Sequence, residues 1–144
     1  MNSLGNPLFS IIIPTYNRAT FIGKAVQSVI DQTFEDWELI IVDDASEDDT
    51  QSVLSSFHDG RLRVIRNPEN LERSVSRNRG IDMARGRYVC YLDSDDLFLA
   101  DHLENLGKHI EASEDNVALF AASVVKRSAA GETYVDMLRR PELT

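Results

Sequence analysis

Two short acidic segments are the strongest candidates for chemistry in this sequence. Asp43-Asp44 and Asp93-Ser94-Asp95-Asp96 each follow an apolar run of the kind that forms a buried strand. Carboxylates with no imidazole or thiolate nearby favour Mg2+ or Mn2+ over zinc or copper. Because Mg2+ completes its coordination with water and substrate phosphates, the pattern predicts a divalent-cation site for a phosphate-bearing ligand.

Helix capping is the alternative explanation for such aspartates, since a carboxylate before a helix accepts backbone N–H bonds and suits the helix dipole. We expect that structural role at Asp48, Asp49 and Asp101. Capping explains one carboxylate for each helix, whereas three carboxylates within 93–96 need another reason. Like charges gathered at one edge of a fold repel each other, so this cluster favours a bound cation.

The hydrophobic pattern predicts a scaffold that brings the acidic segments together. The expected strands cover 8–13, 37–42, 62–65, 87–92 and 117–125, and the expected helices cover 20–30, 50–57, 75–84 and 100–113. This alternation is typical of an α/β fold, a mostly parallel sheet with helices on both faces. The carboxyl ends of parallel strands share one edge, where ligands bind, so we expect both acidic segments to meet there.

Local signals set the expected ends of these elements. Pro14 is expected to end the first strand, Thr20 to cap the first helix, and 129–131 to form a turn into a last short strand. The sequence contains no internal repeat, low-complexity tract or visible linker. We therefore expect a single domain over 1–144.

The composition limits the class of protein. The chain has 144 residues with 24 acidic and 15 basic side chains, giving a net charge of −9. An acidic chain is unsuited to general nucleic-acid binding, which depends on neutralising phosphates. The single cysteine, Cys90, cannot form an internal disulfide, no apolar stretch could span a bilayer, and the first residues lack a secretory signal. We expect a cytoplasmic protein, at most peripheral to the inner face of the membrane.

Basic charge is concentrated in one segment. Residues 61–87 contain eight arginines against three acidic residues, a net charge of +5 in a chain whose remainder carries −14. A solvated helix face would explain any one of these arginines. An arginine-rich stretch that leads into an acidic strand end could also hold an anion beside a metal ion.

Four segments together resemble a known family. They read SIIIPTYNR at 10–18, ELIIVDDAS at 38–46, SRNRG at 76–80 and YLDSDD at 91–96. Their order and spacing resemble the successive signatures of family 2 glycosyltransferases, which have the Rossmann-like GT-A fold. The resemblance extends from about Phe9 to Val135.

The resemblance implies a role for each matching residue. The nucleotide base would be held by Pro14, Thr15, Tyr16 and Asp44, where a carboxylate suits the uracil ring N–H. Further nucleotide contacts would come from Arg77 and Asn78 and from the Asp-x-Asp motif, Asp93-Ser94-Asp95. In that motif the first carboxylate would face the ribose, and Asp95 would ligate the Mg2+ or Mn2+ ion that bridges the phosphates. Arg77 would be the cation nearest to the diphosphate.

The reaction implied is inverting transfer of a sugar from a nucleotide-diphosphate donor, with UDP-sugar preferred, to a saccharide or lipid-linked acceptor. In the family, the general base follows the strand that corresponds to 117–125. This chain ends at Thr144, so we expect a C-terminally truncated GT-A domain that forms the donor-binding half, and we assign no catalytic base. Uncovered sheet edges and apolar surface would then favour a homo-oligomer.

Two other functions stay open from the sequence. One is a module that binds nucleotide-sugars and transfers nothing. The other is a phosphoacceptor receiver domain, because Asp44 and Asp93 are 49 residues apart and Ser123 follows 30 later. A strand and helix precede the acidic pair, and no lysine ends a later strand where receiver chemistry needs one, so the receiver is disfavoured.

Overall fold

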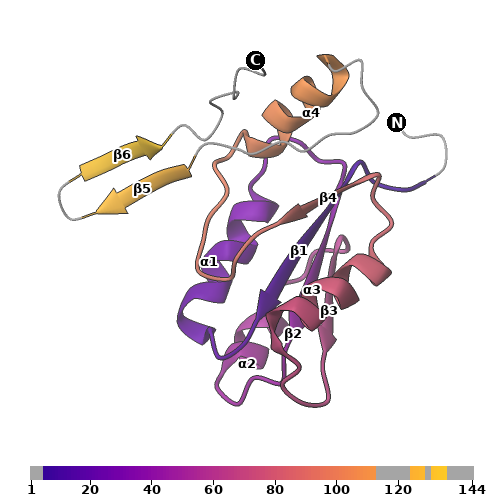
Figure 1. Ribbon diagram of the computed structural model, residues 1–144, viewed down its shortest axis with the longest axis vertical. Helices are drawn as coiled ribbons and strands as arrows, with labels where there is room; N and C mark the ends of the chain where they lie inside the picture. Colours follow the sequence, from indigo (N-terminus) through magenta and orange to yellow (C-terminus); the bar gives the residue numbers. More distant parts are fainter. Residues whose placement is uncertain (1–4, 113–123, 129–130, 136–144) are drawn as a thin grey trace, which may run out of the picture. The chain divides into compact units, whose positions relative to one another are not determined.

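The computed structural model describes residues 5–112, 124–128 and 131–135. Its elements, in chain order, are β1 (Phe9–Thr15), α1 (Ala19–Ile30), β2 (Trp37–Asp43), α2 (Thr50–Ser55), β3 (Leu62–Arg66), α3 (Glu72–Met83), β4 (Tyr88–Tyr91), α4 (His102–Ala112), β5 (Val124–Ser128) and β6 (Gly131–Val135) (Figure 1). The chain divides into two compact units, residues 1–103 and 104–144. In the second unit β5 and β6 form an antiparallel pair.

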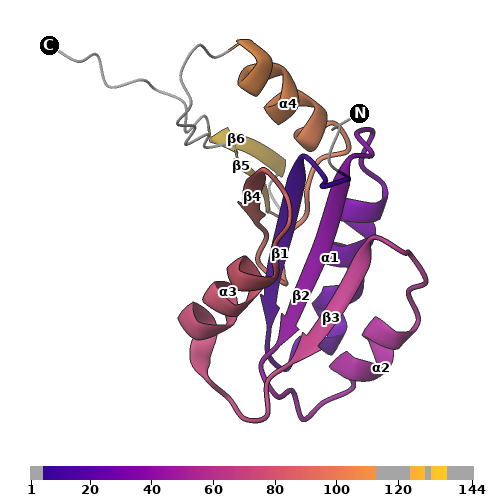
Figure 2. The same cartoon turned by 90° about the vertical axis from the view of Figure 1, so that its right-hand side faces the viewer.

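The first unit contains a parallel sheet with the strand order β3-β2-β1-β4. Helices α1 and α2 cover one face of this sheet, and α3 covers the other (Figure 2). Right-handed crossovers explain the change of face, because the chain moves outward from β1 to β3 and then returns to place β4 beside β1. The α/β prediction is confirmed. A receiver domain has the order 2-1-3-4-5, so the strand order rules out that alternative.

The core of the first unit consists of the two central strands. Every residue of β1 and β2 is buried, as expected for parallel strands covered on both faces. The prediction that Pro14 ends the first strand is wrong, since β1 continues to Thr15 with Pro14 paired to Val42. Pairing of β1 with β4 stops at Ile12, so no ladder on that side requires the N–H that proline lacks.

Helix α1 begins at Ala19, so Thr20 is not its cap. The caps come instead from the start of α2 and the loop before it: the Thr50 hydroxyl accepts from the Arg18 N–H at 3.1 Å, and Asp48 accepts from the Ala19 N–H at 3.0 Å. Asp48 also accepts from the Thr50 N–H. The structural role predicted for Asp48 is confirmed, and the hydrogen bond from Thr50 lowers the pKa of its carboxyl.

Helix α3 approaches the sheet closely through small residues. Its Ser76 and Gly80 are buried, and a Cβ at Gly80 would lie 2.6 Å from an Ile12 side-chain carbon. Only glycine allows this approach without displacing the Ile12 side chain. Elsewhere α2 ends two residues earlier than expected, and α4 covers 102–112. Most of the strand predicted at 117–125, and part of the turn predicted at 129–131, lie outside the described residues.

Strand β4 lies at an edge of the four-stranded sheet, where Val89 and Tyr91 are exposed. Cys90, between them, is largely buried, and burial raises the pKa of its thiol to about 12. Among the described residues no helix has the length and apolar character needed to cross a membrane.

A buried carboxylate organises the amino edge of the same sheet. Glu38 in β2 accepts from the Ser10 hydroxyl at 2.7 Å and from the Arg85 N–H at 2.6 Å, and it pairs with the guanidinium groups of Arg63 and Arg85. The Ser10 hydroxyl in turn accepts from the Gly86 N–H at 2.8 Å. Burial raises the pKa of Glu38, but these bonds and the charge of Arg63 outweigh it, so the net shift is downward.

This shift predicts the acid sensitivity of the fold. The folded-state pKa of Glu38 lies below the ordinary value of 4.5, so its contribution to stability is present above that pH and is lost as the pH falls through the folded-state pKa. We expect the free energy of unfolding, measured by urea denaturation from pH 7 down to about pH 3, to fall in this range. Glu38→Gln should flatten that part of the profile, and an unchanged profile would contradict the assignment.

Candidate functional site

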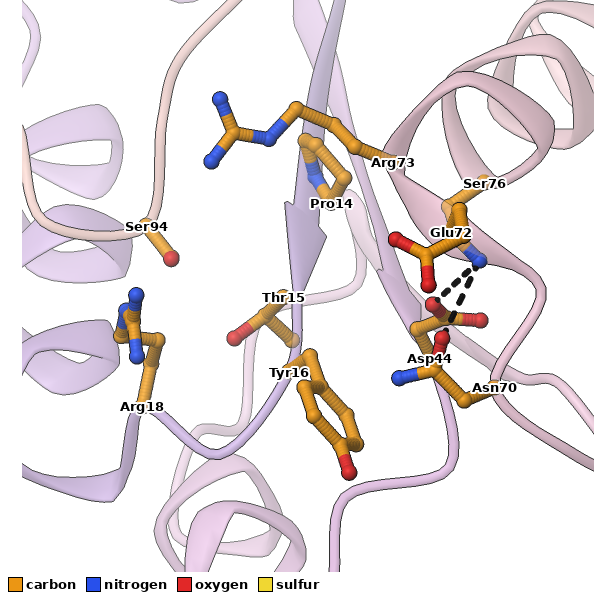
Figure 3. Close-up of a pocket in the computed structure, with 10 residues that line it drawn as sticks. All are labelled: Pro14, Thr15, Tyr16, Arg18, Asp44, Asn70, Glu72, Arg73, Ser76 and Ser94. Atoms are coloured by element: carbon orange, nitrogen blue, oxygen red, sulfur yellow. Dashed lines mark hydrogen bonds between the residues drawn. The ribbon is translucent and has the colours of Figure 1, made fainter.

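A pocket lies at the carboxyl ends of the strands, on the side of the sheet where β1 and β4 meet (Figure 3). Its lining residues are Pro14, Thr15, Tyr16, Arg18, Asp44, Asn70, Glu72, Arg73, Ser76 and Ser94. The volume is about 190 Å³, below the roughly 300 Å³ at which a pocket encloses a whole drug-sized ligand. By itself the pocket therefore fits one part of a larger ligand. It occupies the topological switch point between β1 and β4, the usual ligand site of such sheets.

Asp44, predicted from the sequence to bind a base, is buried at the side of this pocket. One carboxylate oxygen accepts from the Asn67 side-chain amide at 2.7 Å and from the Leu71 N–H at 2.8 Å, and the other accepts from the Glu72 N–H at 2.9 Å. A carboxylate has about four acceptor sites. One site on the second oxygen is therefore left for a ligand.

The capping by Asp44 explains why α3 begins earlier than the sequence predicted. The expected start was Val75, but the helix begins at Glu72 because the Asp44 carboxylate, directly after β2, accepts from the Leu71 and Glu72 N–H groups. Glu72 adopts a φ of 72°, which is uncommon for a residue other than glycine. The local sequence does not reveal this cap, since Asp44 is 28 residues away.

Thr15 and Tyr16 bring two further chemical groups to the pocket. The Thr15 hydroxyl is buried and has no hydrogen-bond partner among the described residues. Buried polar groups are rarely left unpaired, so this hydroxyl is available to a ligand. Tyr16 is 40% exposed, and Figure 3 shows its ring beside Asp44 and Asn70, where a planar ring could stack. Pro14, Thr15, Tyr16 and Asp44, to which the family resemblance assigns the base, all line this pocket.

The predicted Asp-x-Asp motif follows β4, and only its middle residue, Ser94, lines the pocket. Asp93 is paired with Arg77 of α3, with 3.0 Å between a guanidinium nitrogen and a carboxylate oxygen. The Arg77 guanidinium also lies 5.3 Å from the centre of the Tyr91 ring. Asn78, on the same helix, is exposed and lies outside the pocket lining.

Fewer carboxylates at the carboxyl ends of the strands lack a neutralising partner than the sequence implied. Arg66 neutralises Asp43, and Arg77 pairs with Asp93, so neither needs a cation for balance. The excess remains at Asp95 and Asp96, both exposed. Burial raises the pKa of Asp96, and the charges of Asp95 and Asp93 add to the shift. This is the repulsion that the acidic cluster predicts.

The donor set of this cluster suits a hard cation with few protein ligands. No group of three His, Cys, Asp or Glu side chains that could hold a metal occurs within the described ranges. Mg2+ is commonly bound by one or two carboxylates, with waters and substrate phosphates as its other ligands. The residues at 93–96 fit that arrangement. They do not fit a fully protein-ligated zinc site.

Two pocket arginines, Arg18 and Arg73, were missed from the sequence. Figure 3 shows the Arg18 guanidinium facing Ser94 and that of Arg73 extending past Pro14. Neither forms an ion pair within the part of the chain that the structure describes. Most of the other arginines of 61–87 neutralise acids, so the basic segment largely balances charge. The net charge of the segment gave no signal that distinguishes Arg73 from them.

Comparisons with known proteins agree with this geometry. The model of the family described as Glycosyl transferase family 2 matches residues 10–141. WfgD of Escherichia coli, named as a UDP-Glc:alpha-D-GlcNAc-diphosphoundecaprenol beta-1,3-glucosyltransferase, is 38% identical over 97 residues, which cover 67% of this chain and 38% of WfgD.

Two solved structures share the fold. Residues 1–349 of Staphylococcus aureus TarS in complex with UDP-GlcNAc superpose with a TM-score of 0.69 and 30% identity, covering 72% of this chain and 31% of that chain. The mannosyltransferase PcManGT of Pyrobaculum calidifontis in complex with GDP-Man and Mn2+ gives a TM-score of 0.66 and 25% identity, covering 78% and 34%. The chain spans about half or less of the length of the curated relatives that it matches.

Proposed function

Because the chain belongs to glycosyl transferase family 2, we propose that it is the nucleotide-binding half of an enzyme that transfers a sugar from a nucleotide-diphosphate donor, preferably a UDP-sugar, to an acceptor. The observation that carries this proposal is the set of unsatisfied groups in the pocket. The Thr15 hydroxyl has no partner in the part of the chain that the structure describes, and Asp44 retains one acceptor site beside Tyr16. Uracil offers a ring N–H for the carboxylate and a flat face for the tyrosine ring.

The sugar diphosphate would extend from this pocket toward the end of β4. Ser94, which lines the pocket, connects it to Asp93 and Asp95. In this proposal Asp93 faces the ribose, Asp95 ligates a Mg2+ or Mn2+ ion, and Arg77 and Asn78 lie beside the nucleotide. Support for a cation comes from the PcManGT complex with Mn2+ and from the excess charge at Asp95 and Asp96. The bound cation would act as a Lewis acid on the phosphate oxygens.

The proposed reaction is an inverting displacement. The oxygen of an acceptor hydroxyl forms a bond to the anomeric carbon, and the bond from that carbon to the phosphate oxygen breaks. The nucleoside diphosphate leaves with the bonding electrons, and the acceptor proton passes to a general base, for which we assign no residue. Arg77, together with Arg18 and Arg73, which form no ion pair with the described residues, would stabilise the charge that develops on the leaving group.

The acceptor is proposed to be a saccharide or a lipid-linked saccharide. WfgD is named for an acceptor on diphosphoundecaprenol. An acceptor of that kind would require the enzyme to work at the inner face of a membrane, as a cytoplasmic protein associated with its surface. We also propose self-association of the chain, supported by the edge position of β4 among the described strands and by the exposed side chains of Val89 and Tyr91.

A panel of nucleotide-sugars tests the proposal directly. We expect UDP-glucose or UDP-GlcNAc to raise the thermal unfolding temperature of this chain in the presence of Mn2+, because a ligand that binds only the folded state stabilises it. The increase should be smaller with EDTA. GDP-mannose and CDP are the comparison ligands for the base, and the absence of a shift with every nucleotide would contradict the proposal.

A module that binds nucleotide-sugars without transferring the sugar is the second candidate. It would use the same groups as the enzyme, the Thr15 hydroxyl and the remaining acceptor site of Asp44, and it differs only in the transfer step. Hydrolysis or transfer of the bound sugar by this chain, measured by release of UDP, would decide for the enzyme.

A further inference from the structure

Asp43, the neighbour of the proposed base-binding Asp44, has a different environment. Its side chain is fully buried at the end of β2. One carboxylate oxygen accepts from the N–H and the hydroxyl of Ser46, and the other accepts from Gln51 at 2.6 Å and from Arg66 at 2.6 Å. All of its contacts are therefore internal, and it does not line the pocket.

Ser46 extends this network to the loop that follows β1. Its hydroxyl accepts from the Asn17 N–H at 2.9 Å while it donates to Asp43. The side-chain oxygen of Asn17 accepts from the Glu47 N–H at 2.8 Å, so Asn17 is bound to the β2 loop on both sides. We call Asp43, Ser46, Asn17 and Arg66 the Asp43 network.

The Asp43 network affects the pocket through the position of Asn17. Asn17 lies between Tyr16 and Arg18, which both line the pocket. It has a φ of 50°, a left-handed conformation that asparagine tolerates better than most residues. Because the chain reverses at Asn17, the conformation of this residue determines where the Tyr16 ring and the Arg18 guanidinium lie.

We infer that Asp43 is a positioning residue for nucleotide binding. Through its bonds to Ser46, and through the bonds of Ser46 and the β2 loop to Asn17, it fixes the positions of Tyr16 and Arg18 in the pocket. This inference rests on the proposed function. Arg66, at the end of β3, bonds both Asp43 and the Ser46 carbonyl at 2.8 Å, so the ends of three strands contribute to the same loop geometry. Asp43 contacts no ligand in this scheme, whereas Asp44 does.

The chain offers a matched control for the test. Ser46 and Ser10 are both buried, and the hydroxyl of each donates a hydrogen bond to a buried carboxylate. Ser46 lies at the carboxyl ends of the strands and Ser10 near their amino ends. Ser46→Ala and Ser10→Ala should therefore lower the unfolding temperature by similar amounts. UDP affinity is measured by calorimetry with Mn2+, below the unfolding transition of both variants. We expect the Kd to be roughly tenfold higher for Ser46→Ala and to change by no more than about twofold for Ser10→Ala.

A second variant and a ligand-free readout complete the design. Asn17→Gly keeps the backbone N–H and tolerates the left-handed φ but removes the bond to Glu47, so we expect weaker UDP binding in a folded protein. Amide hydrogen exchange at 16–18 should accelerate in Ser46→Ala and stay at the parent rate in Ser10→Ala.

The outcomes separate the two proposals. Equal UDP affinities for Ser46→Ala and Ser10→Ala, or unchanged exchange at 16–18 in Ser46→Ala, would overturn the positioning role. Failure of the parent chain to bind UDP would overturn the proposed function, and the exchange rates would still decide whether Ser46 holds the loop.

Discussion

Asp95→Ala is expected to abolish the gain in nucleotide affinity that a divalent cation gives. Asp95 is exposed beside Asp93 and Asp96, and Asp93 is paired with Arg77, so Asp95 is the carboxylate with the fewest internal commitments. Removing a group that supports a metal ligand commonly costs 10–100-fold in affinity, and removing the ligand itself should cost roughly that or more. The measurement is the Kd of UDP with Mn2+ and with EDTA. The variant should give the parent's EDTA value under both conditions.

Asp101→Ala is the control for this experiment, because it removes one exposed carboxylate from the same connection outside the cluster. We expect it to retain the cation-dependent gain. Since the side chain of Asp95 accepts no bond from the described residues, the fold should be unaffected, and the circular dichroism spectrum checks this. A Mn2+-dependent gain in Asp95→Ala equal to that of the parent would refute the metal assignment.

Asp44→Asn is expected to weaken both the fold and uridine binding. The carboxylate accepts from Asn67, Leu71 and Glu72, and an amide would direct its N–H2 group at one of these donors. A buried donor left without an acceptor costs about 1–3 kcal/mol, which we expect as the loss in unfolding free energy. The same amide would present a donor to the uracil ring N–H, so the Kd of UDP should rise by roughly tenfold or more.

The matched control is Asp49→Asn, which removes one negative charge from the exposed residue directly after the Asp48 cap. The capping role predicted for Asp49 is wrong, since its side chain forms no cap bond at the start of α2. It should leave UDP affinity and stability near the parent values. Affinity is measured by calorimetry at a temperature where all variants are folded, so that the stability loss does not enter the Kd. Unchanged UDP affinity in Asp44→Asn would show that this residue only caps α3.

The central strands were predictable because buried parallel strands are continuous apolar runs, and the expected bounds of β2 differ from the structure by one residue. The edge strand β3, which has a shorter apolar pattern, also differs by one residue. Helix starts were less predictable. The caps of α1 come from Asp48 and Thr50, and those of α3 come from Asp44. All lie 28 or more residues from at least one N–H that they bind. The local capping signal at Thr20 and the local pattern that placed a helix start at Val75 were therefore misleading.

The candidate site was predictable where it depends on strand ends. Tyr16, Asp44 and Ser94 lie around one pocket because parallel strands end at one edge. The place of Arg73 in the pocket was not predictable. The sequence does not show which of the neighbouring arginines pair with acids, so it does not show that Arg73 forms no ion pair with the described residues. Arg77 and Asp93 were both predicted, but their mutual ion pair follows from the packing of α3 on the sheet.

Cys90 has a practical consequence for experiments on this chain. It is the only cysteine, and its thiol, with a pKa of about 12, contains very little thiolate at neutral pH. Maleimide reagents attack the thiolate, so a second cysteine introduced on the surface would be labelled far faster than Cys90. A fluorophore attached in this way near the loop after β1 would report pocket occupancy in the native background, with no need to remove the natural thiol first.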